Sequence, residues 1–203
     1  LRVVLDTAHG ATFRVAPAVF RRLGLHVETL NDAPDGLNIN EDCGALHPES
    51  VSRAVVKTGA RFGFSFDGDG DRMIPCTAKG NVLDGDHVLY LAGKNYLHTH
   101  RLPLRTVVAT VMSNIGLEIA LRREGLDLLR TDVGDRNVYT AMMEKGHPIG
   151  GEQSGHIIFL HDLRTGDGIL AALRLLDVLE SGTLDLDAEA ATMTRYPQIL
   201  RNV

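Results

Sequence analysis

The sequence has few of the features that mark secreted, membrane-bound or nucleic-acid-binding proteins. Only two of its 203 residues are cysteines, so no disulfide framework can form, which favours a reducing, cytoplasmic setting. No apolar run approaches the roughly 20 residues that span a bilayer, and the N-terminus lacks the basic start of a signal peptide. The 21 Lys and Arg residues are nearly balanced by 26 Asp and Glu residues. A net charge of -5, spread along the chain, argues against binding to nucleic acid or another polyanion.

The sequence begins abruptly, at Leu1, with an apolar stretch that looks like a strand already under way. A natural start normally shows Met and a lead-in, so we expect the chain to be an excised segment of a longer protein. Its 44% hydrophobic content is enough to build a core, and its length favours one or two domains.

Short apolar runs alternate with segments of helical spacing. The runs are rich in Val, Ile, Leu and Phe and are nearly continuous, as strands covered on both faces are. They predict strands at residues 2–6, 26–30, 62–66, 106–111, 126–131 and 156–160. Apolar residues three and four positions apart predict helices near residues 51–55, 115–121 and 169–176. Alternating strands and helices of this kind indicate an α/β fold.

Residues 77–86 are rich in turn formers and predict a boundary between two units, residues 1–80 and 81–203. A single domain with a hairpin at this position is the alternative. Residues 181–183 are predicted to end a helix. Residues 198–203 are predicted to form a strand, or a linker toward a further domain.

An acidic loop, residues 67–72, follows directly on the predicted strand 62–66. In it Asp67, Asp69 and Asp71 alternate with glycines, and Arg72 follows. Carboxylates at alternate positions of an extended backbone point to one side, and glycine permits the curvature that lets them converge. Three close carboxylates repel one another unless a cation lies between them, and carboxylate oxygens suit Mg²⁺, Mn²⁺ or Ca²⁺. The loop therefore predicts a divalent-cation site, with Arg72 placed to bind a phosphate.

Two other interpretations of the acidic loop are weaker. An EF-hand also has Asp at its first, third and fifth positions, but its sixth residue should be Gly and is Arg72, and its twelfth should be Glu and is Ala78. A solvated acidic turn is the other alternative, because Gly and Asp form turns readily. The location at the end of a core strand, where α/β folds place ligands, favours metal binding.

A second loop, residues 150–156, sets four polar side chains among glycines. Glu152, Gln153, Ser154 and His156 offer a carboxylate, an amide, a hydroxyl and an imidazole. Such groups can hydrogen-bond the hydroxyls and the amine of a sugar. By itself the motif is weak, because a polar, glycine-rich turn before a strand is ordinary.

Together the two loops are far more specific. Residues 67–72 match the metal-binding loop of the α-D-phosphohexomutase superfamily, and residues 151–156 resemble its sugar-binding loop, in the same order along the chain. Residues 6–11 look like the opening turn of that family's domain 2, and residues 131–136 resemble a loop of its domain 3. The resemblance covers essentially the whole chain. It implies two consecutive α/β domains with mixed sheets flanked by helices, the middle two of a four-domain enzyme.

The resemblance also implies an activity, that of a cytoplasmic isomerase that transfers a phosphoryl group within a phosphosugar. A phosphoserine in domain 1 phosphorylates the sugar, the bisphosphate reorients, and the enzyme takes back the other phosphate, with Mg²⁺ neutralising charge. Gln153 and residues 165–168 and 196–203 are most similar to the branch that acts on glucosamine phosphate, toward the amino sugars of the cell wall. The branch that acts on mannose and glucose phosphates, which usually has Met in place of Gln153, is one alternative. A non-catalytic module that binds cations or sugar phosphates is another.

Carried over residue by residue, the resemblance implies a role for ten side chains and one glycine turn. The metal ligands are Asp67, Asp69 and Asp71, and Arg72 contacts the phosphosugar or the phosphoserine. The substrate-binding residues are Glu152, Gln153 and Ser154, with Gly134, Asp135 and Arg136. His156 either contacts or exchanges protons with the substrate, or is a strand-edge histidine satisfied by the backbone.

Two parts of the family's machinery are missing from the sequence. None of its serines lies in the Ser-His-Asn setting of the nucleophile, and the phosphate-binding loop of domain 4 is absent. We therefore expect the chain alone to be inactive without domains 1 and 4. We also expect it to bind a divalent cation only weakly, since one ligand is missing. No general acid or base is assigned.

Overall fold

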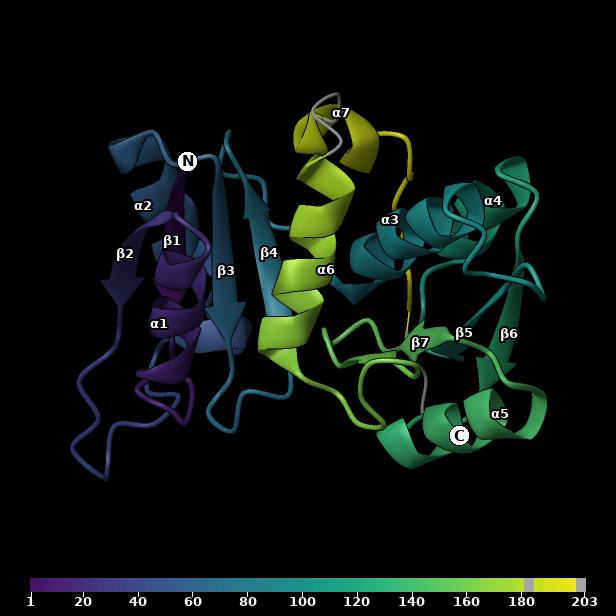
Figure 1. Ribbon diagram of the computed structural model, residues 1–203, viewed down its shortest axis with the longest axis horizontal. Helices are drawn as coiled ribbons and strands as arrows, with labels where there is room; N and C mark the ends of the chain where they lie inside the picture. Colours follow the sequence, from purple (N-terminus) through teal and green to yellow (C-terminus); the bar gives the residue numbers. More distant parts are fainter. Residues whose placement is uncertain (181–184, 200–203) are drawn as a thin grey trace.

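The computed structural model describes residues 1–180 and 185–199 and contains two α/β units (Figure 1). The sheet of the first unit has the order β2-β1-β3-β4, with β1 parallel to β2 and β3, and β4 antiparallel to β3. Its strands are β1 (Arg2–Asp6), β2 (His26–Leu30), β3 (Phe62–Phe66) and β4 (Met73–Thr77). The predicted α/β fold with mixed sheets is confirmed.

The second unit repeats this topology. Its sheet has the order β6-β5-β7-β8, again with two parallel pairings and an antiparallel last strand. Its strands are β5 (Thr106–Thr110), β6 (Asp127–Thr131), β7 (Ile149–Gly151) and β8 (Ile157–Phe159). The division of the chain at residue 80 stays a prediction, although the two sheets lie on either side of it.

The helices cover both faces of each sheet. They are α1 (Val15–Arg22), α2 (Glu49–Thr58), α3 (Gly85–His98), α4 (Ile115–Arg123), α5 (Asp135–Lys145), α6 (Gly168–Glu180) and α7 (Leu186–Ala190), with a 3₁₀ turn, η1 (Gly44–Leu46). None of the helices in the described ranges is long and apolar enough to cross a membrane.

One core extends through both units. Alternate residues of β1 point to opposite faces: Val3 and Leu5 belong to the large buried cluster that also contains residues of α1 and α6, and Val4 belongs to the cluster formed with α2. The helix α6 lies between the two sheets in Figure 1 and packs against β3 and β4 as well as β8. Because α3 and α4 belong to the same buried cluster, the two units are joined by apolar packing.

The six predicted strands are present, three of them with the predicted bounds and three shorter by one residue at one or both ends. The three predicted helices are also present, and the side chain of Asn114 caps α4 by accepting from the backbone N–H of Gly116. The predicted helix end at residues 181–183 and the segment 200–203 lie outside the described residues. Residues 198 and 199 form no strand.

Candidate functional site

The acidic loop is held against the turn that follows β1. The backbone N–H of Ala11 donates to the carbonyl oxygen of Gly68 at 2.7 Å. A Cβ on Gly10 would lie only 2.2 Å from that same oxygen, so a side chain at this position would push the loop away. One carboxylate oxygen each of Asp67, Asp69 and Asp71 lies within 4.8 Å of the others. The predicted convergence of the three side chains is therefore present.

The electrostatics of the acidic loop fit a cation. The pKa of Asp67 is raised to about 6, chiefly by burial and also by the negative charges of Asp71 and Asp69, against the backbone N–H of Arg72 that donates to it at 3.1 Å. One oxygen of Asp71 is buried without a hydrogen-bond partner. A buried, unpartnered carboxylate oxygen is costly, and a hard divalent ion among three carboxylates removes this cost. The donor set fits Mg²⁺, Mn²⁺ or Ca²⁺.

Arg72 connects the acidic loop with the space beside it. Its Nε lies 3.6 Å from Asp67 Oδ2 and 3.8 Å from Asp71 Oδ1. The side chain stays 41% exposed and lines an open hollow of about 530 Å³. A guanidinium held by carboxylates on one side and open to solvent on the other can bind a phosphate group.

The second loop is the hairpin between β7 and β8, and it packs directly on the acidic loop. The backbone N–H of Met73 donates to the carbonyl of Gly155 at 3.1 Å, and Arg72 and His156 form an antiparallel bridge. Gly155 has φ +96, and a Cβ there would lie 2.6 Å from the carbonyl oxygen of Met73. Glycine is required at this position because the two loops approach so closely.

His156 faces the acidic loop. Its Nδ1 lies 3.0 Å from Asp71 Oδ2, its side chain is almost fully buried, and its Nε2 has no partner in the described structure. The ring packs against Gly166, where a Cβ would come within 2.4 Å of it. His156 thus positions a carboxylate of the acidic loop and does not line the hollow. Its direct contact with substrate stays a prediction.

The hollow brings the two predicted loops together. Its walls come from six segments: the acidic loop, the second loop, the start of α3, the chain at the end of β5, the chain after β6, and the chain after α7. The lining residues are Arg72, Asp84, Thr110, Met112, Val133, Glu152, Gln153, Ser154 and Arg195. Glu152 accepts a hydrogen bond from the backbone N–H of Gly134 at 3.0 Å, so the turn before α5 is held to the second loop.

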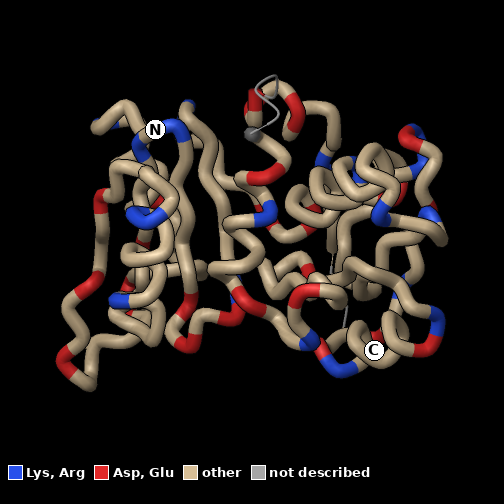
Figure 2. Tube along the Cα trace, viewed as in Figure 1, with Lys and Arg blue, Asp and Glu red and all other residues tan. Residues whose placement is uncertain are grey.

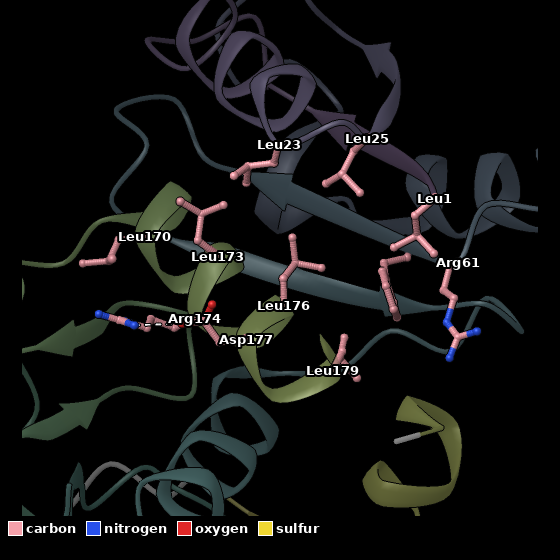
Figure 3. Close-up of a pocket in the computed structure, with 11 residues that line it drawn as sticks. Leu1, Leu23, Leu25, Arg61, Leu170, Leu173, Arg174, Leu176, Asp177 and Leu179 are labelled. Atoms are coloured by element: carbon pink, nitrogen blue, oxygen red, sulfur yellow. Dashed lines mark hydrogen bonds and ion pairs between the residues drawn. The ribbon is translucent and has the colours of Figure 1, made fainter. Parts of the chain in front are cut away.

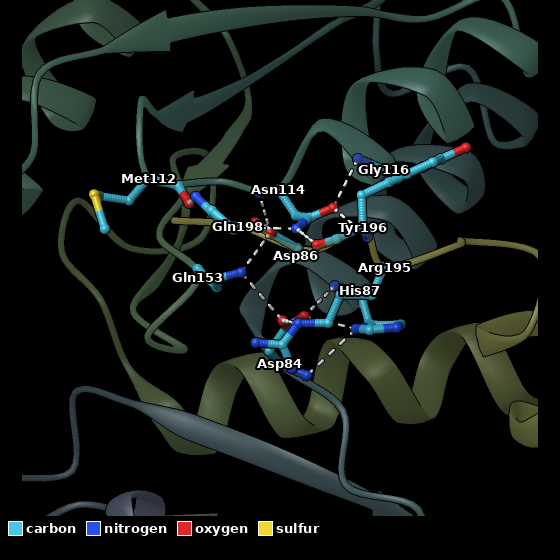
Figure 4. A network of polar contacts seen from close by, with 10 residues as sticks. All are labelled: Asp84, Asp86, His87, Met112, Asn114, Gly116, Gln153, Arg195, Tyr196 and Gln198. Carbon is cyan, nitrogen blue, oxygen red and sulfur yellow. Dashed lines mark hydrogen bonds and ion pairs between the residues drawn. The ribbon is translucent and has the colours of Figure 1, made fainter. Parts of the chain in front are cut away.

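The second loop is also held by the N-terminus of α3, through a polar network (Figure 4). The amide of Gln153 donates to Asp84 Oδ2 at 3.4 Å and to Asp86 Oδ2 at 3.2 Å. A Cβ on Gly85 would lie 2.0 Å from the carbonyl oxygen of Glu152. The side-chain nitrogen of Gln153, predicted to bind the sugar, therefore already donates its hydrogen bonds to the protein.

The pKa values of the two aspartates in this network are shifted in opposite directions. Burial alone would raise the pKa of Asp84, but its hydrogen bonds with His87 and the positive charges of His87 and Arg195 hold that pKa below its ordinary value. Asp86 is fully buried, and burial raises its pKa despite the backbone N–H of Asn114 that donates to it at 2.8 Å. Its second oxygen is buried without a partner.

Besides His156, three predicted substrate-binding residues, Gly134, Asp135 and Arg136, do not line the hollow. Asp135 and Arg136 are exposed at the start of α5 and are not among the lining residues. The sequence analysis did not single out Asp84, Asp86 or Arg195, and it placed Asp84 and Asp86 in the turn-rich stretch 77–86. Asp84 with His87 forms a capping box at the start of α3, and a helix start in this stretch was the signal available for finding it.

Charges elsewhere are interspersed. Figure 2 shows Lys and Arg positions alternating with Asp and Glu positions over both units. In the hollow, charges of both signs, from Arg72, Arg195, Asp84 and Glu152, meet open space. Such a mixture suits a ligand that carries an anionic and a cationic or hydroxyl group.

Comparisons with solved structures support the fold. A phosphoglucomutase/phosphomannomutase family protein from Burkholderia thailandensis superposes with a TM-score of 0.85 at 28% identity, covering 96% of this chain and 43% of that one. The N-acetylphosphoglucosamine mutase of Aspergillus fumigatus, solved in complex with GlcNAc-6P and magnesium, has a TM-score of 0.71 at 21% identity, covering 97% and 50% of the two chains. At that identity the second likeness concerns the fold alone.

Sequence comparisons identify the family. The phosphoglucosamine mutase of Desulfotalea psychrophila is 50% identical over 201 residues, which are 99% of this chain and 45% of the relative. That of Anaeromyxobacter dehalogenans is 51% identical over 203 residues, 100% of this chain and 44% of the relative. The chain thus spans less than half the length of these relatives. Residues 1–80 match the family model of phosphoglucomutase/phosphomannomutase alpha/beta/alpha domain II, and residues 84–196 match that of domain III. The chain belongs to the phosphoglucomutase/phosphomannomutase family.

Proposed function

We propose that the whole protein interconverts glucosamine 6-phosphate and glucosamine 1-phosphate. The observation that carries this proposal is the position of Arg72, which contacts two of the three clustered aspartates and also lines the hollow beside Glu152 and Gln153. A phosphate bound by Arg72 would place the attached sugar against the second loop. The relatives of about 50% identity that are named phosphoglucosamine mutase support the same activity.

In this proposal the acidic loop holds Mg²⁺ through Asp67, Asp69 and Asp71. The ion supplies charge neutralisation for the phosphoryl group during transfer. Arg72 binds the phosphate from the side of the hollow, and His156 holds Asp71 at its Nδ1. The preference for Mg²⁺ over Mn²⁺ or Ca²⁺ is part of the proposal.

In this proposal the second loop binds the sugar of the substrate. Ser154 is exposed at the hollow, and Glu152 and Gln153 line it while holding Gly134 and the start of α3. Glu152 and Asp84 place two carboxylates at the hollow, and a sugar amine, which is cationic at neutral pH, would be attracted to them. Gly134, Asp135 and Arg136 are proposed to approach the substrate from the turn before α5.

The rest of the machinery belongs to the remainder of the protein. We propose that the phosphorylated serine and a phosphate-binding loop lie in two further domains of the same chain, as the 44–45% coverage of the relatives allows. A cytoplasmic location is proposed because both Cys43 and Cys76 are free thiols.

The test is turnover by the whole protein on glucosamine 6-phosphate, mannose 6-phosphate and glucose 6-phosphate. We expect kcat/KM to be highest for the glucosamine compound. A preference for mannose 6-phosphate would reject the choice of substrate, and no turnover of any of the three would reject the enzyme in favour of a binding module.

The role of Arg72 is tested by Arg72→Lys in the same protein. Lysine keeps the charge but loses the planar fork that binds phosphate through two hydrogen bonds, so kcat/KM should fall by roughly 10–100-fold, as expected when about 1.5–3 kcal/mol of a charged hydrogen bond is lost. The matched control is Arg122→Lys, whose side chain is 69% exposed on α4. Equal activity of the two variants would contradict the proposal.

A further inference from the structure

Two hollows of the described structure differ in what they offer a ligand. The groove between α6 and the end of α1, of about 670 Å³, is lined chiefly by leucines, and its Arg174 and Asp177 pair with each other (Figure 3). The hollow at the second loop is lined mostly by polar and charged side chains. Selectivity between polar ligands is therefore to be sought at the second loop, in the direction in which each polar group points.

The side chain of Gln153 is fixed by the start of α3 (Figure 4). Its Nε2 lies 3.4 Å from Asp84 Oδ2 and 3.2 Å from Asp86 Oδ2. Its backbone carbonyl oxygen accepts from the backbone N–H of Gly85 at 2.9 Å. Three consecutive residues thus hold one glutamine, both at its backbone and at the end of its side chain.

The chemistry of the two aspartates determines which way the amide of Gln153 points. Hydrogen bonds with His87 hold the pKa of Asp84 below its ordinary value against the effect of burial, so its carboxylate only accepts. Burial raises the pKa of Asp86, but its Oδ2 already accepts from the backbone N–H of Asn114 at 2.8 Å, so this oxygen accepts in either protonation state. Only the NH₂ of a carboxamide can face two acceptors.

Because its nitrogen is turned toward the protein, Gln153 offers its oxygen to the hollow. Among the residues that the structure describes, Oε1 of Gln153 accepts no hydrogen bond, and it is not a buried atom. The neighbouring Glu152 is arranged in the same way: one oxygen accepts from the backbone N–H of Gly134 at 3.0 Å, and the other is open. Two adjacent side chains at the hollow thus present acceptors and no donor.

A wall that only accepts favours a ligand group that only donates. An ammonium group has three donors and no acceptor, whereas a hydroxyl has one donor and also accepts. A hydrogen bond from a charged donor is also stronger than one between neutral groups. Arg195 Nε lies 3.9 Å from Asp84 Oδ2 and offsets part of that charge, so Glu152 and Gln153 remain as the open acceptors.

We propose that Gln153 selects an amino-sugar phosphate over its hydroxyl counterpart, and that Asp86 is a positioning residue that acts through Gln153. This proposal rests on the proposed function and adds the group that distinguishes the substrates. Asp86 is fully buried and does not line the hollow, so its effect on a ligand passes through Gln153. Asp86 is itself held by the backbone N–H of Asn114, whose side chain caps α4. The packing of two helix starts therefore sets the direction of the amide.

The test compares glucosamine 6-phosphate with glucose 6-phosphate, which differ only in an amine against a hydroxyl. In the whole protein kcat/KM is measured for both sugars, and the Kd of each by calorimetry, in Gln153→Met, Asp86→Ala and Asp86→Asn. A change that merely loosens the loop weakens both sugars alike, whereas loss of the amine contact changes their ratio. The matched control is Leu121→Ala, at a fully buried position of α4, which destabilises through a cavity and should leave the ratio unchanged.

We expect the preference for glucosamine 6-phosphate to fall about tenfold in Gln153→Met and Asp86→Ala, roughly the difference between a charged and a neutral hydrogen bond. Asp86→Asn keeps an accepting oxygen and should retain the preference. Gln153→Met keeps the test valid if Asp86→Ala folds poorly. An unchanged ratio in Gln153→Met or in folded Asp86→Ala would overturn the proposal, and so would an equal loss in Asp86→Asn and Asp86→Ala. If the unaltered protein turns over neither sugar, the proposed function fails, and the ratio of the two Kd values still tests the role of Gln153.

Discussion

Two fully buried aspartates, Asp6 and Asp86, show how much the hydrogen-bond partners of a carboxylate matter. Asp6 accepts hydrogen bonds from the backbone N–H groups of Ala8 and Gly44 and from the side chains of Asn31 and Ser50. Asp86 accepts from Asn114 and Gln153 through one oxygen only; its other oxygen has no hydrogen-bond partner, and the nearby Ser113 hydroxyl offsets only part of the effect of burial on its pKa. The first carboxylate organises the turn after β1, and the second carries a desolvation cost that its partners do not fully compensate.

Asp86→Asn should therefore stabilise the chain at neutral pH. Because the pKa of Asp86 is raised in the folded state, its ionisation opposes folding: stability is greatest below the ordinary carboxyl pKa and falls as pH rises through the raised value. The variant removes this dependence, so its advantage in urea unfolding should be absent near pH 4 and present at pH 7.5.

Asp6→Asn is the control, since its amide would face groups that donate hydrogen bonds. It should lose about 1–3 kcal/mol of unfolding free energy at pH 7.5. A loss for both variants at neutral pH would show that the single oxygen of Asp86 contributes more than its burial costs.

Gly10 is a second residue whose identity is dictated by its neighbours. In Gly10→Ala the new Cβ meets the backbone of Gly68, so the acidic loop must shift. We expect a loss of about 1–3 kcal/mol of stability from overpacking and weaker binding of Mg²⁺ and Mn²⁺ by the whole protein in calorimetry. Gly24→Ala is the control: Gly24 has φ +80 but open space around it. It should cost about 1–2 kcal/mol for its left-handed backbone and leave metal affinity unchanged.

At the scale of elements, the sequence predicts strands wherever apolar runs are continuous and misses those that are interrupted. The strand β4 contains Pro75, which is tolerated because β4 is the edge strand of its sheet and has only an isolated bridge, to Val82, on its outer side. The strand β7 contains Gly150, where a Cβ would lie 2.7 Å from the sulfur of Met142. Its glycine reflects the close approach of α5, which a local pattern does not reveal.

The helix α3 was missed for a related reason. Its start, residues 84–86, reads as a turn, and nine of its residues are buried on all sides, so no amphipathic stripe marks it. The two loops of the candidate site were found because their chemistry is local in the sequence. Gln153 lies 69 positions after Asp84 and 67 positions after Asp86 in the sequence. Nothing in the local sequence predicts contacts between side chains so far apart along the chain.

The start of α3 links helix stability to the second loop, which Asp84→Ala should reveal. The substitution removes the capping bond to the backbone N–H of His87 at 3.2 Å and one partner of Gln153, so we expect a loss of about 1 kcal/mol, the usual cost of an N-cap. In the whole protein KM for the phosphosugar should rise as the second loop loosens.

Asp84→Asn keeps a capping oxygen and should retain most of the stability. Asp185→Ala, which removes the cap of α7, controls for the loss of a cap away from the hollow and should leave KM unchanged. An unchanged KM in Asp84→Ala would separate the start of α3 from substrate binding.

For the whole molecule, the shared core predicts that the two units unfold together. The distribution of natural probes allows this to be measured without labels. The four tyrosines, Tyr90, Tyr96, Tyr139 and Tyr196, all lie in the second unit, and there is no tryptophan. Both cysteines, Cys43 and Cys76, lie in the first unit and are buried. Tyrosine fluorescence thus reports on one unit, and the reactivity of thiols in urea reports on the other.

Two substitutions distinguish one cooperative unit from two. Leu175→Ala opens the α6 part of the shared core, whereas Met142→Ala opens a cluster that lies within the second unit alone. Each should cost about 2–5 kcal/mol, as expected for buried Leu and Met residues. If packing through α6 couples the units, the two probes shift together: in each variant the urea midpoint of tyrosine fluorescence falls by the same amount as the midpoint of thiol exposure. If the units unfold independently, the thiols of Met142→Ala stay protected at urea concentrations where its tyrosines are already exposed. Such a difference between the two midpoints would show that the packing of α6 between the sheets does not couple the unfolding of the two units.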